Sequence, residues 1–398
     1  MTAVPGETGA RGERHPQRVG LALTAEMGDE PQPEPRLVLP DYDGPCVAGL
    51  VPALLGPLEE VPDWVPESIG DARQVVLLVL DGLGWEQLQQ RKAACPTLAA
   101  MAGRPITTVA PSTTSTALTS ITTGLTPGEH GVIGYRMAVN GEVLNVLRWS
   151  TVAGDAMHTI PPHKVQPMAP FLGQRPPVVT RAEYRRSGFT GAHLDGVRFW
   201  GYRTVATLVT EIERLLQESE PFIYGYYDGL DKVAHEYGLG QHYTAELTFV
   251  DRVVDYLLSR LPRDAVLVVT ADHGQVDVDR NVRQLSSEVL AHVAMQSGEG
   301  RFRWLHARAG RTRALYEAAR AHHGDVAWVV EREQTIADGW FGPKVSEAAA
   351  SRLGDVALVA HADVAFYDQY DTGPFELVGR HGSLTSAEML VPLLSAGR

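Results

Sequence analysis

Cysteine is scarce in this sequence, which has only Cys46 and Cys95 among 398 residues. Two cysteines are too few for a disulfide framework or a cysteine-based zinc site. No apolar run approaches the roughly 18 residues that a membrane-spanning helix requires. The N-terminal stretch carries arginines but lacks the apolar segment of a secretory signal. We therefore expect a cytoplasmic protein with no membrane partner.

Basic residues are also in deficit. The chain has 35 lysines and arginines against 48 aspartates and glutamates, a formal charge of −13. Binding to nucleic-acid backbones depends on clustered lysine and arginine, so a nucleic-acid polymer is not expected as a partner. A small phosphate-ester substrate held by metal ions remains compatible with this charge, because some of the excess acid can serve as metal ligands. The oligomeric state is not determined by the sequence.

The chain divides into a tail and one large domain. Residues 1–36 are rich in proline and glycine and lack an aliphatic run, which predicts a disordered N-terminal tail. The mixed apolar pattern that begins near Leu37 predicts a catalytic domain over residues 37–398.

Buried strands alternate with amphipathic helices in this domain. Continuous apolar runs at 75–80, 222–227 and 265–270 predict strands that are buried on both faces, and an aspartate follows each one closely. Apolar residues at helical spacing predict helices over 205–216 and 247–261. This alternation indicates an α/β fold with a mostly parallel sheet flanked by helices. Ligands bind at the carboxyl ends of the strands in such sheets.

Two segments interrupt the alternation. Residues 136–200 predict an inserted cap or lid, and residues 285–350 a smaller excursion with a helix over 312–323 and a strand over 326–330. The cap segment is rich in basic and aromatic residues: Arg136, Arg148, Trp149, His158, His163, Lys164, Arg181, Arg185, Arg186 and Trp200. Its cations are interpreted either as a solvated surface or as contacts to substrate phosphate. Its tryptophans either stack on a base or belong to the core.

Candidate metal ligands occur at four places along the chain. Each has an ordinary structural explanation when taken alone, such as a helix cap, a turn or a surface loop. Taken together they supply only oxygen and nitrogen donors, which suit a pair of divalent ions. The candidates are Asp81 after the first strand, Asp231 and His235 one helical turn apart, Asp272 and His273 after a later strand, and His381 in a glycine-flanked loop.

A candidate nucleophile lies in the hydroxyl-rich segment 111–124. Apolar residues within the segment fall at helical spacing, so it predicts a helix that begins with hydroxyl residues. Backbone N–H groups and the helix dipole favour negative charge at that position. On chemistry alone, Thr113, Thr114 and Thr116 are all candidates.

The order of these motifs resembles the alkaline phosphatase superfamily, and most closely its nucleotide pyrophosphatase/phosphodiesterase branch. The resemblance covers residues 70–395. It depends on Asp81-Gly, on Thr114 ten residues before Gly124, and on the segment 124–131. It continues with Asp231-xxx-His235, Asp272-His273-Gly and the late His381-Gly-Ser-Leu-Thr.

The resemblance implies an alkaline-phosphatase-like fold with two metal ions, usually zinc. Its ligand sets are Asp231, His235 and His381 for one ion, and Asp81, Asp272 and His273 for the other, with Thr114 facing the second ion. It further implies that Thr114 is the nucleophile and forms a phosphothreonine intermediate.

One position departs from the family pattern. Phosphodiesterases of this branch have an asparagine twenty-one residues after the nucleophile, and here that position is Tyr135. Tyr135 and the neighbouring Arg136 are therefore the candidates for binding the substrate phosphate.

The expected function is that of a two-metal phosphoric-ester hydrolase of the phosphodiesterase or nucleotide pyrophosphatase type. The alternatives are a phosphomonoesterase with the same site and a catalytically silent binding member of the fold. The complete ligand set argues against the silent member.

Overall fold

The computed structural model describes residues 36–57, 61–70, 72–371 and 376–397. The disordered tail predicted for residues 1–36 lies outside this range, apart from its last residue. No helix of the described residues is long and apolar enough to cross a membrane.

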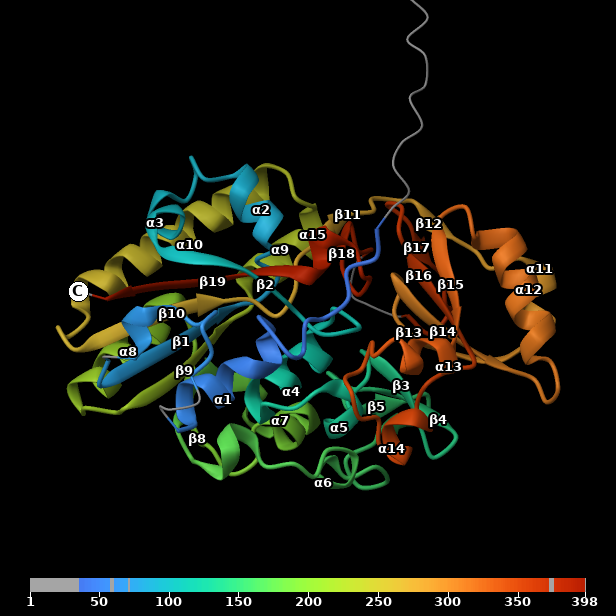
Figure 1. The fold of residues 1–398 in the computed structure, drawn as a ribbon, viewed down its shortest axis with the longest axis horizontal. Coiled ribbons are helices and arrows are strands. Elements are labelled where there is room, and N and C mark those ends of the chain that lie inside the picture. Colours follow the sequence, from blue (N-terminus) through green and yellow to red (C-terminus); the bar gives the residue numbers. More distant parts are fainter. Residues whose placement is uncertain (1–35, 58–60, 71, 372–375, 398) are drawn as a thin grey trace, which may run out of the picture. The chain divides into compact units, whose positions relative to one another are not determined.

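A seven-stranded sheet forms the centre of the domain (Figure 1). Its strands, in spatial order, are β2 (Ala102–Thr107), β19 (Leu390–Gly397), β10 (Ala265–Thr270), β1 (Gln74–Leu80), β9 (Phe222–Tyr227), β7 (Pro177–Arg181) and β8 (Arg198–Tyr202). The five strands from β10 to β8 are mutually parallel, whereas β19 is antiparallel to both of its neighbours. The predicted mostly parallel sheet flanked by helices is confirmed.

The composition of β1 explains its central place. All seven of its residues are buried, because β10 and β9 pair with its two edges and helices cover both faces. A strand in this position has no solvent face, so its sequence is a continuous run of aliphatic residues rather than an alternation.

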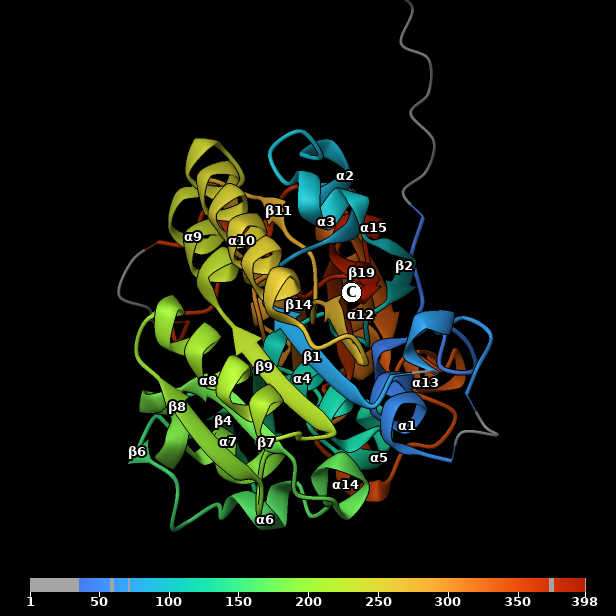
Figure 2. The ribbon, with the colours of Figure 1, turned by 90° about the vertical axis from the view of Figure 1, so that its left-hand side faces the viewer.

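Helices cover both faces of the sheet (Figures 1 and 2). One layer contains α8 (Val205–Gln217), α9 (Gly229–Tyr237) and α10 (Gln241–Arg260), with α2 (Trp85–Gln90) and α3 (Pro96–Ala100) nearby. The other contains α1 (Leu50–Leu55), α4 (Thr114–Thr123), α5 (Pro127–His130) and α7 (Gly188–His193). The buried residues of α8 are the apolar ones at helical spacing, from Leu208 to Leu216.

The segment expected as one inserted cap divides into two parts. Its first part forms a small antiparallel sheet of β3 (Arg136–Val139), β4 (Glu142–Asn145), β5 (Ser150–Thr151) and β6 (Gly154–Asp155). It continues through the short helix α6 (Pro162–Val165). Its second part carries β7 and β8, which pair in parallel with each other and extend the main sheet beyond β9. Residues from 177 onward therefore differ from the expectation: they belong to the central sheet.

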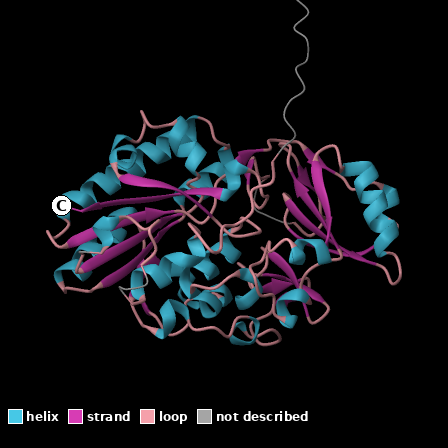
Figure 3. Ribbon diagram, in the orientation of Figure 1, coloured by secondary structure: helices cyan, strands magenta, loops and turns pink. Residues whose placement is uncertain are grey.

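The second excursion is a separate antiparallel sheet with its own apolar core (Figures 1 and 3). Its strands are β13 (Val293–Gly298), β14 (Phe302–Ala307), β16 (Val356–Ala360) and β15 (Ala327–Glu331), and α11 (Ser287–Leu290) and α12 (Thr312–His323) lie beside them. Short elements complete the chain: α13 (Arg332–Ala337), α14 (Glu347–Ala350), α15 (Ser386–Met389), and the two-stranded pairs β11 (Val276–Asp277) with β18 (Gly379–Arg380) and β12 (Val282–Arg283) with β17 (Ala365–Phe366).

Candidate active site

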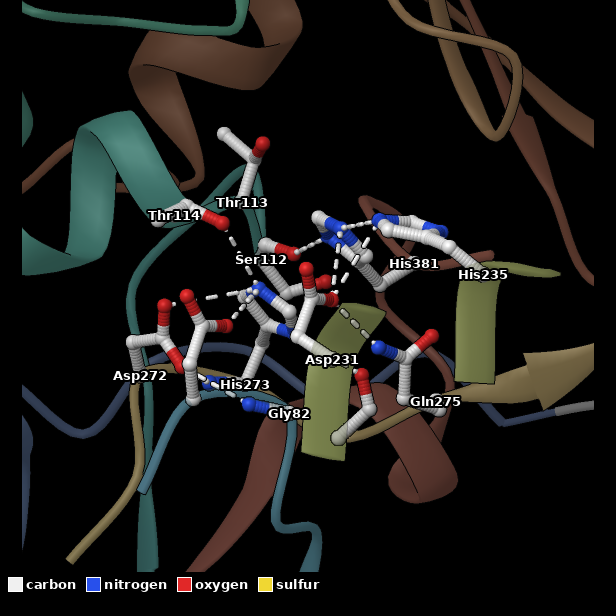
Figure 4. Close-up of polar contacts among 12 residues, drawn as sticks. Gly82, Ser112, Thr113, Thr114, Asp231, His235, Asp272, His273, Gln275 and His381 are labelled. Carbon is white, nitrogen blue, oxygen red and sulfur yellow. Dashed lines mark hydrogen bonds and ion pairs between the residues drawn. The ribbon is translucent and has the colours of Figure 1, made fainter. Parts of the chain in front are cut away.

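The seven predicted site residues lie together at one edge of the central sheet (Figure 4). Asp81 directly follows β1, and Asp272 and His273 follow the neighbouring strand β10. The adjacent carboxyl ends of β1, β9 and β10 place these segments side by side. The others are Asp231 and His235 on α9, which follows β9, His381 just after β18, and Thr114 at the start of α4.

Two histidines and one aspartate form the first group of donor atoms. Nε2 of His235 lies 3.3 Å from Nε2 of His381 and 3.3 Å from Oδ1 of Asp231. Nδ1 of His235 is bonded to the carbonyl of Gly379, and Nδ1 of His381 to the carbonyl of Ser112. A carbonyl only accepts, so both Nδ1 atoms carry the hydrogen. The Nε2 lone pairs therefore face each other and the carboxylate, which is the arrangement of ligands around a cation.

The second group surrounds His273. Its Nε2 lies 3.4 Å from Oδ1 of Asp81, 3.4 Å from Oδ2 of Asp272 and 3.1 Å from Oγ1 of Thr114. Its Nδ1 donates to the carbonyl of Gly274, so Nε2 again offers a lone pair. Among the described residues, Oδ1 of Asp81 and Oδ2 of Asp272 are buried without a hydrogen-bond partner. Buried carboxylate oxygens are rarely left unpaired, so these atoms fit a metal ion.

Asp231 lies between the two groups. One oxygen of Asp231, one of Asp81 and a ring nitrogen of His273 lie within 4.8 Å of one another, and so do the donor atoms of Asp231, His235 and His381. The described residues thus offer two Asp/His groups that share a carboxylate. This spacing suits two neighbouring divalent ions.

The electrostatics of the cluster indicate a shortage of positive charge. Burial, and then repulsion from Asp272 and Asp231, raises the pKa of Asp81 well above its ordinary value. Burial is also the largest cause that raises the pKa of Asp272. Burial, followed by the nearby imidazoles, lowers the pKa of His381 far below 6.5. Since His381 therefore supplies little positive charge, divalent cations would compensate the three carboxylates.

Three contacts that orient the ligands were not predicted from the sequence. Tyr226 donates its hydroxyl hydrogen to Oδ2 of Asp81. Gln275 donates to Oδ1 of Asp231 at 2.6 Å, and the backbone N–H of Gly82 donates to Oδ1 of Asp272 at 3.1 Å. Groups of this kind fix the direction in which metal ligands point. No local motif marks them, because each depends on the pairing of strands that are distant in the sequence.

Thr114 is the first residue of α4, and Thr113 precedes it as the N-cap. The Thr113 hydroxyl donates instead to Glu299 at 3.0 Å, and the Thr116 hydroxyl is buried without a partner among the described residues. Of the three threonines that the sequence left open, only Thr114 lines the adjoining pocket and contacts His273.

The segment 124–131, which contributes to the family resemblance, has a structural role. Thr126 and Glu129 form a reciprocal capping box at the start of α5, and Gly131 ends that helix in the left-handed conformation. His130 is buried, with Nε2 2.8 Å from the Ser120 hydroxyl on α4 and Nδ1 accepting from the backbone N–H of Val132. The segment therefore fixes α5 against the helix that carries Thr114.

A pocket of about 200 Å³ opens beside Thr114. Its lining combines Asp81, Thr114 and Asp231 with aromatic, aliphatic and hydroxyl side chains. Several of these come from the segment expected as the cap, namely Leu147, Thr180, Tyr184, Ser187, Phe189, Thr190, His193 and Leu194. The cap segment thus reaches the site through aromatic and hydroxyl groups, and none of its arginines or lysines is among the lining residues.

The substrate role predicted for Arg136 does not fit the structure. Arg136 is 4% exposed, and its Nη1 lies 2.7 Å from both Asp368 and Asp371. Its guanidinium binds these two carboxylates in an ion cluster and does not line the pocket. The Tyr135 hydroxyl accepts from Asn145 at 2.8 Å and does not line the pocket, so its role in phosphate binding stays a prediction.

The two cap tryptophans also lie elsewhere. Trp149 is fully buried and donates its indole hydrogen to the carbonyl of Ile160 at 2.7 Å, as a core residue does. Trp200 lies on the edge strand β8, where the Arg214 guanidinium covers its ring at 4.2 Å. Neither lines the pocket.

Comparison with known families gives one match that spans most of the chain. Residues 75–384 match the model of the type I phosphodiesterase / nucleotide pyrophosphatase family. No protein of curated function matches the sequence in a direct comparison.

Solved structures resemble the fold at low sequence identity. Murine ectonucleotide pyrophosphatase/phosphodiesterase 5 is 15% identical, with a TM-score of 0.62 over 82% of this chain and 88% of its own. An inactive threonine-to-alanine variant of that murine protein is known in complex with AMP. Phosphonoacetate hydrolase from Sinorhizobium meliloti 1021 is 19% identical, with a TM-score of 0.60 over 82% of this chain and 90% of its own, in complex with phosphonoacetate.

Proposed function

The chain belongs to the type I phosphodiesterase / nucleotide pyrophosphatase family, and on that basis we propose that it hydrolyses phosphodiesters with Thr114 as nucleophile and two metal ions. Members of this family are metal-dependent hydrolases of phosphoric ester bonds, and the chain is an enzyme of that class. The observation that carries the proposal is the position of the Thr114 hydroxyl, 3.1 Å from Nε2 of a histidine whose other neighbours are two unpartnered carboxylate oxygens.

The donor sets support the choice of metal. Imidazole nitrogen and carboxylate oxygen without thiolate are common ligands of zinc in hydrolases, so zinc is the expected ion. Asp231, His235 and His381 would hold one ion, and Asp81, Asp272 and His273 the other, with Asp231 near both. Such ions, when bound, supply positive charge to the transferring phosphoryl group and lower the pKa of hydroxyl groups beside them.

The residues of the chain would then act in two displacements. The Thr114 oxygen attacks phosphorus, the bond to the ester oxygen breaks, and the alcohol departs with the bonding electrons and takes up a proton. This leaves a phosphothreonine at position 114. Water attacks the same phosphorus, the bond to the Thr114 oxygen breaks, and the hydroxyl recovers its hydrogen.

The start of α4 stabilises the negative charge in both displacements. The backbone N–H groups of Thr114, Ser115 and Thr116 have no acceptor among the described residues. Three such groups at the N-terminus of a ten-residue helix form a site for phosphoryl oxygens. The murine relative supports the role of Thr114, because that protein is inactive after a threonine-to-alanine replacement.

The test compares two matched variants of the zinc-loaded protein. Thr114→Val removes the proposed nucleophile, whereas Thr116→Val removes a neighbouring buried hydroxyl that has no described partner. We expect hydrolysis of bis-p-nitrophenyl phosphate to fall by at least roughly a thousandfold in Thr114→Val and to stay near the wild-type rate in Thr116→Val. Equal rates in the two variants would exclude Thr114 as nucleophile.

Two further measurements separate the alternatives. Acid quenching during turnover, followed by mass spectrometry, should find one phosphoryl group on Thr114. A substrate panel should show faster hydrolysis of bis-p-nitrophenyl phosphate and the p-nitrophenyl ester of thymidine monophosphate than of p-nitrophenyl phosphate. A preference for the monoester by orders of magnitude would instead identify a phosphomonoesterase.

A further inference from the structure

Among the described residues, Lys232 is the only lysine or arginine that lines this pocket. His193 also lines the pocket, but burial lowers its pKa to about 4, so it is neutral at pH 7. Three carboxylates belong to the lining as well, and two of them, Asp81 and Asp231, are candidate metal ligands. The third, Asp228, is the partner of Lys232, so the Lys232 ammonium group is the lining side chain that would attract an anionic group entering the pocket.

The contacts of Lys232 leave it available to a ligand. Its Nζ lies 2.7 Å from Oδ2 of Asp228, and its side chain is 51% exposed. When Lys232 turns to a ligand, Asp228 keeps two other partners, because it also accepts from Nε of Arg181 at 2.5 Å and from the Tyr184 hydroxyl at 2.6 Å. Arg181 has a second, more distant partner in Glu183 at 3.5 Å, which lies outside the pocket lining.

The position of Lys232 ties this cation to the reaction site. It directly follows Asp231 on α9, and both side chains line the same pocket. A substituent attached to a phosphorus near Thr114 and Asp231 therefore extends past Lys232 if it enters the pocket. A lysine of this kind exchanges one carboxylate partner for another at little cost, because its stem is flexible and half exposed.

We infer that Lys232 is a specificity-determining residue that selects substrates whose pocket-bound substituent carries an anionic group, a carboxylate or a second phosphoryl group. This inference rests on the proposed function. The lysine acts on the substituent, not on the reacting phosphorus, so its loss changes which substrates bind rather than the chemical step.

The test measures binding by calorimetry, which needs no turnover. The probes are phenylphosphonate, whose ring carries no charged group other than the phosphonate, and its 3-carboxy, 4-carboxy and 4-phosphono derivatives. The protein is the zinc-loaded full chain in three forms: wild type, Lys232→Gln and Lys232→Arg. Lys164→Gln is the matched control, because Lys164 is an exposed lysine outside the pocket lining.

We expect the wild type to bind at least one charged derivative about tenfold more tightly than phenylphosphonate. Lys232→Gln should lose that preference while its affinity for phenylphosphonate is unchanged, and Lys232→Arg and Lys164→Gln should keep it. The affinities for the carboxy derivatives and for the phosphono derivative show which anion is preferred. An unchanged preference in Lys232→Gln, or no preference in the wild type, would overturn the inference. If the wild type shows the Lys232-dependent preference for charged derivatives but hydrolyses no diester, the inference about Lys232 stands and only the proposed function is wrong.

Discussion

Tyr226 donates its phenolic hydrogen to Oδ2 of Asp81, and the other oxygen of Asp81 faces Nε2 of His273 at 3.4 Å. Tyr226 and Asp81 are 145 positions apart in the sequence and meet because β1 and β9 pair in parallel. The bond fixes the carboxylate with one oxygen directed at the place where the donor atoms converge.

Tyr226→Phe should therefore weaken metal binding without removing a ligand. Partners of this kind typically contribute roughly tenfold to a hundredfold in metal affinity, and we expect a loss in this range in a zinc competition titration. Tyr224→Phe is the matched control, because Tyr224 lies on the same strand, is equally buried, and its hydroxyl has no partner among the described residues. Equal affinities of the two variants would show that Tyr226 does not orient Asp81.

Asp272→Asn should stabilise the metal-free protein. Burial, and to a lesser degree the carboxylate of Asp231, disfavours the charged form of Asp272 by raising its pKa, and the amide keeps an oxygen for the bonds from Gly82 and His273. We expect the melting temperature of the chelator-treated variant to rise by about 2 °C over chelator-treated wild type.

Addition of zinc should reverse the order of the two melting temperatures. An ion present at a hundred times its dissociation constant stabilises a folded protein by about 2.7 kcal/mol, so wild type should gain strongly on addition of zinc. Asp272→Asn lacks one proposed ligand and should gain much less. A variant that gains as much as wild type would remove Asp272 from the ligand set.

His130 should contribute to acid sensitivity. Burial, and then the charge of Arg352, lowers its native pKa to about 3, below the value near 6.5 in the unfolded chain. The unfolded state therefore binds this proton more readily, and the free energy of unfolding falls as the pH drops from about 6.5 toward 3, by at most roughly 1.4 kcal/mol per pH unit.

The check is the difference between wild type and His130→Gln in urea unfolding at pH 7.5 and 5.5. The variant should be less stable at pH 7.5 because it loses the bond to Ser120. Its stability should fall less between the two pH values than that of wild type. Equal losses of unfolding free energy in wild type and His130→Gln between the two pH values would mean that the folded protein does not lower the pKa of His130.

Arg136→Met should reduce stability without affecting substrate binding. Among the described residues, the replacement leaves the buried carboxylate of Asp368 with Arg303, at 3.6 Å, as its only cationic partner, and it costs about 3 kcal/mol of unfolding free energy. Arg148→Met changes an exposed arginine on the neighbouring hairpin and should be nearly neutral. The KM for bis-p-nitrophenyl phosphate should match wild type in both variants. A raised KM in Arg136→Met alone would restore a role in substrate binding.

The sequence predicted three strands of the central sheet, namely the continuous apolar runs. The runs at 222–227 and 265–270 coincide with β9 and β10, because a strand without a solvent face consists of consecutive apolar residues. The strands β2, β7, β8 and β19 were not predicted, and the edge strand β8 is one example. Its exposed and partly buried residues alternate, and it contains Arg198 and Gly201, so its pattern resembles that of a loop.

The candidate site was also predicted from the sequence in part only. Asp81, Asp272 and His273 follow continuous strands, so topology alone predicts that they lie close together. The pocket lining depends on which way side chains point and on pairings between distant segments, and composition does not supply this information. The basic content of 136–200 therefore suggested phosphate contacts, whereas its arginines bind other protein groups and its aromatic residues reach the pocket.

The reversed strand β19 affects the order in which the protein folds. It lies between β10 and β2 and pairs Val391 with Ile106 and Leu394 with Val269. These contacts join segments that are synthesised more than a hundred residues apart, so the edge formed by β2 has no partner in the sheet until residues 390–397 have left the ribosome. Pairing of strands that are this far apart in the sequence is slow. Until then, the facing edges of β2 and β10 lack their partner strand, and unpaired strand edges are places where other chains can add.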